Sequence, residues 1–446
     1  MRLARPTFYT TAIEPERAFL VGVDWRQSPW PVDRSLDELA QLAETAGAVV
    51  VGRMTQRLEN PVPRTFIGSG KVQELIAMVR NLDVDTVIFD DELSPSQQSN
   101  LEKLLGEPIK IIDRTALILD IFGLHAKTRD GRLQVQLAQL QYLLPRLRGM
   151  WSHLAKEQTR GGIGSRFGQG ESQLEVDRRL IRDRIATLRH ELAALERRRD
   201  VQSKQRRSSL AYRIALAGYT NAGKSTLLNK LTGSSVLSED KLFATLDPTT
   251  RFLSLPGGRE ATVTDTVGFI QKLPHTLIDA FKSTLSEVHS ADLILKVVDA
   301  SDPDWDVQLS AVDEVLEGIG SGNVPMVTVF NKVDLLDVLE AQSLHRSIPG
   351  SVSVSARTGS GVEELLARIS DEAAAGDELV SVVIPYSKSA LSTTVHRQGL
   401  VIAESFEGDG AHIVAKVSKR LAEELEPYAE DSHTGSASSN AAMSKG

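Results

Sequence analysis

The sequence predicts a multidomain α/β protein. A P-loop domain is preceded by a small α/β domain with an antiparallel helical hairpin and followed by a small α+β domain. Three observations support this. The chain has 446 residues, more than one hydrophobic core usually serves. Two stretches carry Leu and Ile at coiled-coil spacing. The segment GYTNAGKS (218–225) lies between an apolar strand and a helix, as a phosphate-binding loop does.

Composition limits the protein class. The chain is 41% hydrophobic and 25% charged, which is typical of soluble globular proteins. It has no cysteine, which excludes disulfides, thiolate metal sites and a cysteine nucleophile. The sequence contains no apolar run of membrane-spanning length and no apolar signal core at its N-terminus. We therefore expect a cytoplasmic monomer without stable membrane insertion, and peripheral membrane association stays open.

Charge is distributed unevenly. The whole chain carries a net charge of −8, yet residues 146–210 contain 16 Lys/Arg against 8 Asp/Glu. Phosphates respond to local charge more than to the total, so this basic segment is compatible with nucleic-acid contact. Charge alone favours the other interpretation, a solvated pair of charged helices.

After an N-terminal extension (1–17), residues 18–125 alternate apolar strands with helical stretches. This alternation predicts an α/β domain with a parallel sheet. Strands are expected at 18–23, 48–52 and 86–90, and helices at 36–46, 71–82 and 96–105. The segment GSGK (68–71) lacks the remaining P-loop residues, so a tight turn capping the next helix is the better interpretation.

Residues 126–200 should form the helical hairpin. Leu133, Leu137, Leu140, Leu144 and Leu147 step by 4, 3, 4, 3, and so do Ile181, Ile185, Leu188, Leu192 and Leu195. Each series gives one narrow apolar stripe, the seam of an antiparallel pair. The tip (148–171) combines glycines with basic and aromatic side chains, namely Arg148, Trp151, Lys156, Arg160, Arg166 and Phe167. These residue types suit phosphates and exposed bases, although an irregular loop packed on the hairpin fits as well.

A polar linker (201–210) leads to the P-loop domain (211–375). Glycines free the loop's backbone N–H groups to surround phosphates, and the helix N-terminus adds its positive end. Lys224 is expected to bridge the β- and γ-phosphates, and Ser225 to ligate magnesium. The predicted nucleotide contacts here are Gly218, Tyr219, Thr220, Asn221, Ala222, Gly223, Lys224, Ser225 and Thr226.

The motif NKVD (331–334) follows a buried strand and indicates guanine. A carboxylate at Asp334 can accept two hydrogen bonds from the N1–H and amino group of guanine, which adenine cannot offer. Asn331 would reach N7, Lys332 and Val333 would lie along the base, and Ser355, Ala356 and Arg357 would approach its exocyclic oxygen. Together with the P-loop, this motif predicts a GTPase domain.

Two further segments should sense the γ-phosphate. Asp265, in DTVGF (265–269), is expected to hold magnesium through a water, with Thr266 and Val267 beside the nucleotide and Gly268 donating its N–H to the γ-phosphate. In the preceding segment, Thr245 is the first choice to complete the magnesium shell, with Thr249 or Thr250 as alternatives. Its neighbours Phe243, Ala244, Leu246 and Asp247 are also predicted contacts. The expected catalytic set is Lys224, Thr245 and Gly268.

The residue after Gly268 is Phe269, where Ras-like GTPases have the glutamine that orients the attacking water. A phenyl ring cannot do this, so hydrolysis by the isolated protein should be slow. The remaining chain predicts a small α+β domain (376–427), with strands at 379–384, 400–406 and 412–417 and helices at 386–397 and 419–426. The Ser/Ala/Gly-rich residues 428–446 predict a disordered tail.

With these motifs in hand, the chain resembles the HflX family of ribosome-associated GTPases, in the Obg/HflX branch. The resemblance rests on GYTNAGKST (218–226), LFATLDPT (242–249), DTVGFI (265–270), NKVD (331–334) and, upstream, DRTALILDIF (113–122) and GGIGSRFGQGESQLEVDRR (161–179). It implies GTP and Mg²⁺ as cofactors, and similar GTPases suggest K⁺ dependence through Asn221.

The resemblance also implies partners. It predicts binding to the 50S subunit and its 23S rRNA through the hairpin tip, and GTP-dependent splitting of stalled 70S ribosomes under heat or antibiotic stress. Two other functions stay open: a GTP-regulated anti-association or hibernation factor, and a ribosome-assembly or RNA-remodelling GTPase. ATP use by the N-terminal domain also stays open.

Overall fold

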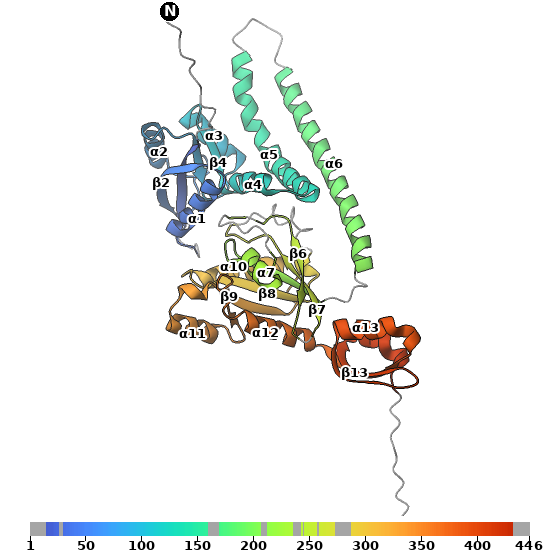
Figure 1. Ribbon diagram of the computed structural model, residues 1–446. Helices are drawn as coiled ribbons and strands as arrows, with labels where there is room; N and C mark the ends of the chain where they lie inside the picture. Colours follow the sequence, from blue (N-terminus) through green and yellow to red (C-terminus); the bar gives the residue numbers. More distant parts are fainter. Residues whose placement is uncertain are drawn as a thin grey trace, which may run out of the picture.

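The structure is a computed structural model that describes residues 15–25, 30–158, 169–206, 212–234, 242–243, 245–256, 258–272 and 287–430. Within these residues, one parallel sheet, one mostly parallel sheet and one antiparallel sheet follow one another along the chain, and a long helical pair stands between the first two (Figure 1). The predicted multidomain α/β architecture is confirmed.

The N-terminal sheet is parallel, as predicted, with strand order β2-β1-β3-β4. Its strands are β1 (Arg17–Trp25), β2 (Val49–Leu58), β3 (Thr86–Phe89) and β4 (Lys110–Asp113). The last of these was not expected, because its sequence, KIID, has only two apolar residues between charged ones. The sheet begins within the predicted extension, since β1 starts at Arg17 and the Glu16 carboxylate accepts a hydrogen bond from the Thr86 hydroxyl at 2.9 Å.

Helices cover both faces of this sheet. Leucines of α1 (Val32–Thr45) and α4 (Arg114–His125) fill the core on one face. The apolar residues of α2 (Ser69–Asn81) and α3 (Pro95–Leu105) fill the core on the other. Gly68 is the N-cap of α2, as the turn interpretation of GSGK requires, and its N–H donates to the Gln56 side chain at 2.9 Å.

The helical hairpin consists of α5 (Arg129–Gln158) and α6 (Gln169–Arg206), which extend side by side away from the P-loop domain (Figure 1). Arg129 pairs with Glu191 and Gln136 with Arg184, so the helices are antiparallel. The predicted seam forms one cluster, with the exception of Leu147. The linker prediction was partly wrong: α6 continues to Arg206, because residues 201–206 contain no Gly or Pro and are mostly good helix formers.

The P-loop domain is built on a sheet of order β10-β9-β8-β5-β7-β6, in which only β6 is antiparallel to its neighbour. Its strands are β5 (Tyr212–Gly218), β6 (Thr249–Ser254), β7 (Glu260–Asp265), β8 (Leu293–Asp299), β9 (Met326–Asn331) and β10 (Val352–Ser353). One core packs α7 (Lys224–Thr232) and α12 (Val362–Ala374) against the sheet. A second core includes α10 (Trp305–Gly318). The described chain also contains α11 (Val338–Ser347) and the 3₁₀ turn η1 (Val333–Leu335).

The C-terminal sheet is antiparallel with order β11-β13-β12. Its elements are β11 (Asp377–Ile384), η2 (Tyr386–Lys388), α13 (Ser389–Gln398), β12 (Leu400–Phe406), β13 (Ala411–Ser418), α14 (Lys419–Leu425) and η3 (Glu426–Tyr428). The helix expected from residue 386 therefore begins as a 3₁₀ turn. The tail prediction was wrong for its first three residues, because Ala429 bridges to Val382 and Glu430 N–H bonds to Ser381.

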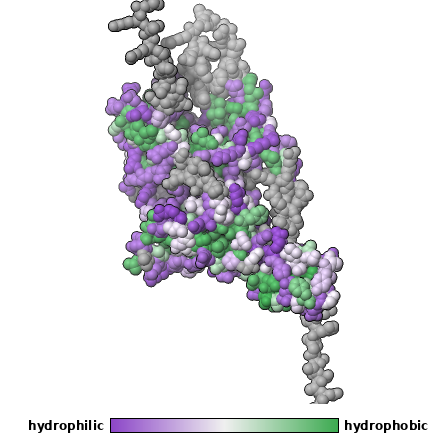
Figure 2. Space-filling model, viewed as in Figure 1, coloured by the Kyte–Doolittle hydropathy of each residue, from purple (hydrophilic) through white to green (hydrophobic). Residues whose placement is uncertain are grey.

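Exposed hydrophobic side chains are spread over the described chain, and Figure 2 shows hydrophobic colour in several places, the C-terminal sheet region among them. Leu379, Tyr386, Leu400, Ile402 and Phe406 are all more than 45% exposed. Throughout the described chain, no helix is both long enough and apolar enough to cross a membrane.

Candidate nucleotide-binding site

The P-loop connects the end of β5 to the start of α7. Gly223 has φ +87°, and a Cβ added there would lie 2.3 Å from the Asn331 Nδ2 atom. A Cβ on Gly218 would lie 2.2 Å from the Val297 carbonyl oxygen. The loop therefore requires glycine at both positions, and α7 directs its first N–H groups toward the loop's concave side.

Lys224 is buried at the base of the loop. Its Nζ donates hydrogen bonds to the carbonyl oxygens of Gly218 at 3.1 Å and Tyr219 at 2.8 Å. Burial lowers the pKa of Lys224 to about 8, even though the nearby Asp265 carboxylate favours the charged form. An anionic ligand in the loop would favour that charged form further.

Three predicted magnesium ligands lie together. The Ser225 hydroxyl donates to Asp265 Oδ2 at 2.5 Å and lies 2.9 Å from the Thr245 hydroxyl. Of the alternatives, Thr250 lies on β6 and contacts the Thr264 hydroxyl instead. Asp265 Oδ1 is buried without a hydrogen-bond partner in the described chain, and burial raises the pKa of this carboxyl. Hard oxygen donors and an unpaired carboxylate oxygen fit Mg²⁺.

Gly268 and Phe269 follow on the γ-phosphate side. A Cβ at Gly268 would come within 2.9 Å of the Thr220 Cα and 3.0 Å of the Lys224 Nζ, so a side chain is excluded there. The Phe269 N–H donates to the Gly218 carbonyl at 3.1 Å, and its own carbonyl accepts from the Thr220 N–H at 2.7 Å. The Phe269 ring is 2% exposed and packs in the core beneath the sheet, beside Ala217.

The residues predicted to recognise guanine also lie together. The Asn331 amide donates to the Ala222 carbonyl at 2.9 Å and accepts from the Ala356 N–H at 3.0 Å. Asp334 accepts a hydrogen bond from the Ser355 hydroxyl at 2.6 Å and pairs with the exposed Arg357. These contacts, the Ser355 hydrogen bond first, lower the pKa of Asp334.

Four other predicted nucleotide contacts lie in this domain. Lys332 has φ +64° and pairs with Asp299 at 2.7 Å. The Val333 N–H bonds to the Val354 carbonyl at 3.3 Å. Asn221 has φ +60° at the exposed crest of the P-loop, and Thr226 lies in the first turn of α7.

Several predicted γ-phosphate-side residues face the N-terminal half instead of the P-loop. One continuous core joins α1, α4 and α5 to Tyr219, Leu242, Phe243, Leu246, Val267 and Ile270. The rings of Phe243 and Phe122 pack edge to face at 4.6 Å. The Thr266 hydroxyl points the other way and donates to the Leu216 carbonyl at 2.6 Å.

Asp247 joins the same segment to the hairpin. Its carboxylate accepts hydrogen bonds from the backbone N–H groups of Lys127, at 2.9 Å, and Thr128, at 2.8 Å, and from the Thr128 hydroxyl. It therefore satisfies donors immediately before α5 begins at Arg129.

A buried polar network, not expected from the sequence, lies between the P-loop domain and the N-terminal sheet. Arg114 is 1% exposed and pairs with Asp90 at 2.6 Å and Glu38 at 2.5 Å. Lys272, three residues after Phe269, pairs with Asp90 at 2.5 Å and Asp91 at 2.7 Å. The Tyr219 hydroxyl donates to Glu38 and accepts from the Gln271 N–H at 2.7 Å.

The pKa values of this network follow from its burial and charges. Burial alone would raise the pKa of Asp90, but Arg114 and Lys272 outweigh it and lower the value to about 2. Burial raises the pKa of Glu38 despite the Arg114 charge. The only sequence signal is the acidic pair Asp90-Asp91 after a buried strand, at the point where strand order in the sheet reverses.

For some predicted residues the structure describes no side chain. Arg148, Trp151 and Lys156 belong to α5, but their side chains are outside the described set. Arg160, Arg166, Phe167 and, near the P-loop, Ala244 lie outside the described residues.

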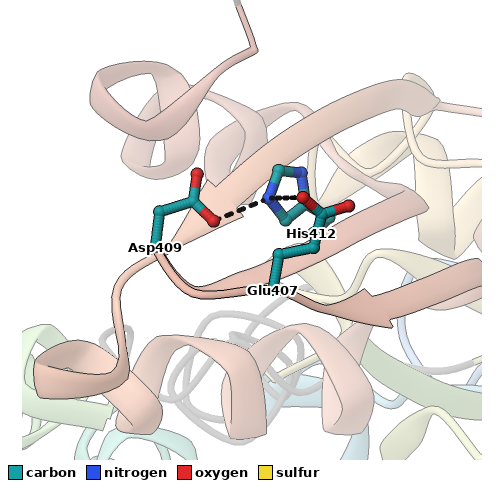
Figure 3. A group of neighbouring side chains, drawn as sticks. All are labelled: Glu407, Asp409 and His412. Atoms are coloured by element: carbon teal, nitrogen blue, oxygen red, sulfur yellow. Dashed lines mark hydrogen bonds and ion pairs between the residues drawn. The ribbon is translucent and has the colours of Figure 1, made fainter.

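A separate cluster at the β12–β13 turn contains Glu407, Asp409 and His412 (Figure 3). The His412 ring lies 3.0 Å from Asp409 through Nε2 and 2.6 Å from Glu430 through Nδ1. Both nitrogens thus face carboxylates, which raises the pKa of His412 and favours the protonated ring. The cluster is far along the chain from the P-loop, and we interpret it as an ion-paired histidine.

Three known protein families match successive parts of the chain. Residues 33–123 match the family described as "GTP-binding GTPase N-terminal", and residues 125–206 match "GTP-binding GTPase Middle Region". Residues 213–332 match the family described as "50S ribosome-binding GTPase".

Individual relatives match over nearly the whole chain. The GTPase HflX of Caldanaerobacter subterraneus subsp. tengcongensis is 45% identical over 417 residues, covering 94% of each chain. The GTPase HflX of Lacrimispora saccharolytica is 45% identical over 410 residues, covering 91% of this chain and 94% of its own. Among solved structures, a GTP-binding protein from Sulfolobus solfataricus in complex with GDP gives a TM-score of 0.41 at 24% identity, covering 80% of this chain and 98% of the other.

Proposed function

Because the chain belongs to the HflX family of GTPases, we propose that it uses its GTP state to split or rescue stalled 70S ribosomes from the large subunit. Family membership carries the coarser activity: the chain is a GTPase of a 50S ribosome-binding family.

In the proposed site, the P-loop glycines and Lys224 bind the phosphates of GTP, and Asp334 with Asn331 selects guanine. Ser225, Thr245 and, through water, Asp265 would hold Mg²⁺, which supplies charge compensation when bound. The proximity of these three oxygen donors and the unpaired Asp265 Oδ1 support this assignment. The Gly268 N–H would contact the γ-phosphate.

Hydrolysis by this chain alone should be slow. The Phe269 ring is packed under the sheet, so no side chain at the usual glutamine position orients water. We infer that a ribosomal group completes the site. Activators of this kind accelerate other GTPases by about 10³–10⁵-fold.

One observation carries the proposal: the γ-phosphate-side segments are docked on the half of the molecule that bears the hairpin. Leu242, Phe243 and Ile270 are buried in the core of α1, α4 and α5, and Lys272 pairs with Asp90 below that core. Loss of the γ-phosphate would release these segments from the nucleotide. The same event would then change how the hairpin is held on the ribosome.

The test is sedimentation of 70S ribosomes with the protein in GTP, in a non-hydrolysable GTP analogue and in GDP. We expect subunits to separate with GTP and not with GDP, and 50S particles to raise the hydrolysis rate. Intact 70S in every nucleotide state would contradict splitting. Separation with the analogue as well would assign hydrolysis to release of the factor.

Charge reversal at the hairpin tip tests whether the tip contacts the 50S subunit. Reversing Arg160 and Arg166 to Glu should weaken 50S binding, more strongly at low salt, because phosphate contacts release counterions. Arg346→Glu with Lys388→Glu makes the same charge change elsewhere on the surface and is the control. GTP affinity should not change. Equal 50S binding by both double variants would place the contact on another surface.

A second candidate is a factor that only prevents subunit joining. The buried ion pairs of Arg114 with Glu38 and Asp90 favour it, because they join α4 to α1 and β3, and a blocking protein needs a fixed arrangement of its elements. In that case free subunits would stay apart in the GTP state while preformed 70S would not separate.

A further inference from the structure

The wall of the candidate site beside Gly268 lacks a polar side chain from DTVGF. The Phe269 ring lies in the core, and both of its backbone polar groups bond to the P-loop. The Gly268 N–H is the backbone group proposed for the terminal phosphate here, so a side chain that contacts this phosphate from the same direction must come from another segment.

Thr220 of the P-loop is the residue that faces this wall. A Cβ built on Gly268 would lie 2.9 Å from both the Cα and the methyl carbon Cγ2 of Thr220, and 3.0 Å from the Lys224 Nζ, so the methyl group of Thr220 contacts the glycine and the hydroxyl is attached to the same Cβ. Thr220 is thus in close contact with the glycine and near the ammonium group, both of which the proposed function assigns to the γ-phosphate.

The polar groups of Thr220 are unequally used. Its N–H donates to the Phe269 carbonyl at 2.7 Å, so the amide is occupied. Its hydroxyl is different: the residue is 7% exposed, and Oγ1 has no hydrogen-bond partner in the described chain. By contrast, the nearby Thr266 hydroxyl is buried and donates to the Leu216 carbonyl at 2.6 Å.

Buried hydroxyls are rarely left unpaired, because desolvation costs free energy that a hydrogen bond normally offsets. In the described chain, Asp265 Oδ1, on the magnesium side of the same site, is unpaired too. Six buried side-chain oxygens of the described chain lack a partner, and these two are the ones that belong to predicted nucleotide contacts, which suits groups that bind a ligand.

We propose that the Thr220 hydroxyl donates a hydrogen bond to the γ-phosphate of GTP, and so both favours GTP over GDP and positions the terminal phosphate for hydrolysis. A hydroxyl can donate where phosphate offers only acceptors. GDP lacks the acceptor, so the contact distinguishes the two nucleotides. The inference rests on the proposed GTP site.

The test compares Thr220→Val, which keeps the shape and removes the hydroxyl, with Thr220→Ser, which keeps the hydroxyl. Affinities for GDP and for a non-hydrolysable GTP analogue are measured on the full chain, with single-turnover GTP hydrolysis, all without ribosomes. Thr220→Val should lose roughly tenfold or more in analogue affinity and in hydrolysis rate, which is the range for a hydrogen bond to a charged group. GDP affinity should be unchanged.

Controls separate this role from a structural one. Thr220→Ser should recover most of both losses. Thr86→Val removes a buried hydroxyl from the N-terminal sheet, where it bonds to Glu16, and should leave nucleotide binding as it is. Equal losses for GDP and the analogue, or no loss for either, would overturn the proposal. Because no ribosome is present, failure here is distinct from failure of 70S splitting.

Discussion

The two ends of the candidate nucleotide site are built differently. On the guanine side, Asn331, Lys332 and Asp334 bond to Ala222, Asp299 and other partners in loops of the same sheet. On the γ-phosphate side, Tyr219, Asp247 and Lys272 bond to Glu38, Thr128 and Asp90, which belong to the N-terminal half. In the proposed function, the base is thus recognised by residues of the P-loop domain alone, while the segments at the γ-phosphate contact the N-terminal half.

This difference gives the N-terminal sheet a specific role. In open α/β sheets, ligands usually bind where the strand order reverses, at the carboxyl ends of the strands. Here Asp90 follows β3 at that point, and Lys272 of the P-loop domain pairs with it. The sheet edge that binds a ligand in other proteins thus contacts a lysine of the P-loop domain here.

The largest effect should come from the guanine side. Asp334→Asn removes the carboxylate that we propose accepts guanine's two N–H groups, and discrimination in favour of GTP should fall by up to about 10⁴-fold. Competition binding with guanine and xanthine nucleotides measures this. Because the change is local, the buried network at Arg114 should be unaffected; altered unfolding of the N-terminal half would show that the two sides are not independent.

The second-largest effect should come from the buried network around Arg114, which joins the N-terminal sheet to the P-loop domain. Arg114→Met leaves Asp90 and Glu38 without a buried cation partner from α4, and should lower the free energy of unfolding by about 3–5 kcal/mol. Arg259→Met is the matched control, since Arg259 pairs with Asp377 at 2.9 Å in a mostly buried contact toward the C-terminal sheet. Denaturant unfolding and hydrogen exchange measure both variants.

Only Arg114→Met should increase exchange in the peptide covering residues 264–272. If the control variant increases exchange there equally, the network is not what orders this segment.

A smaller effect is expected at Asp247. Asp247→Ala removes the carboxylate that satisfies the backbone before α5, and should lower the free energy of unfolding by about 1 kcal/mol, as loss of a helix cap does. Asp337→Ala removes a comparable cap from α11, where Asp337 accepts from the N–H groups of Leu339 and Glu340. The two variants should lose similar stability by denaturant unfolding.

The two variants should differ in hydrogen exchange: only Asp247→Ala should increase the exchange rate of residues 127–131. Identical exchange in that segment for both variants would remove Asp247 from the connection.

The smallest effect concerns the C-terminal sheet, which contributes to neither side. Hydrogen bonds to Asp409 and Glu430 raise the pKa of His412 above its ordinary 6.5. A raised pKa stabilises the fold below the ordinary value, and this stabilisation is lost as pH rises through the folded-state value. The difference in Tm between the natural chain and His412→Gln should therefore shrink above pH 6.5, with GTP hydrolysis unchanged. A difference that grows with pH would contradict the ion-paired ring.

Local patterns predicted much of this molecule. Strand–loop–helix spacing located the P-loop, and heptad spacing located the hairpin seam, because both depend on residues close in sequence. The short β4 and the continuation of α6 to Arg206 gave weaker signals, since strand length and a polar helix end are set by packing.

The network could not be predicted, for a physical reason. Glu38, Asp90, Arg114 and Lys272 lie on four separate elements or loops, and Tyr219 and Glu38 are 181 residues apart. Nothing in the local pattern specifies which buried charges will pair. Phe243 and Leu246 illustrate the same limit: their positions predicted nucleotide contact, while their side chains pack against the N-terminal half.

Hydrogen exchange of the full chain with GDP and with a non-hydrolysable GTP analogue tests the central claim most directly. If the γ-phosphate side is connected to the N-terminal half, exchange should differ between the two nucleotides in α1, in α4 and in the first turn of α5, while the peptide containing Asn331–Asp334 is equally protected by both. Differences confined to residues 212–375 would contradict the claim.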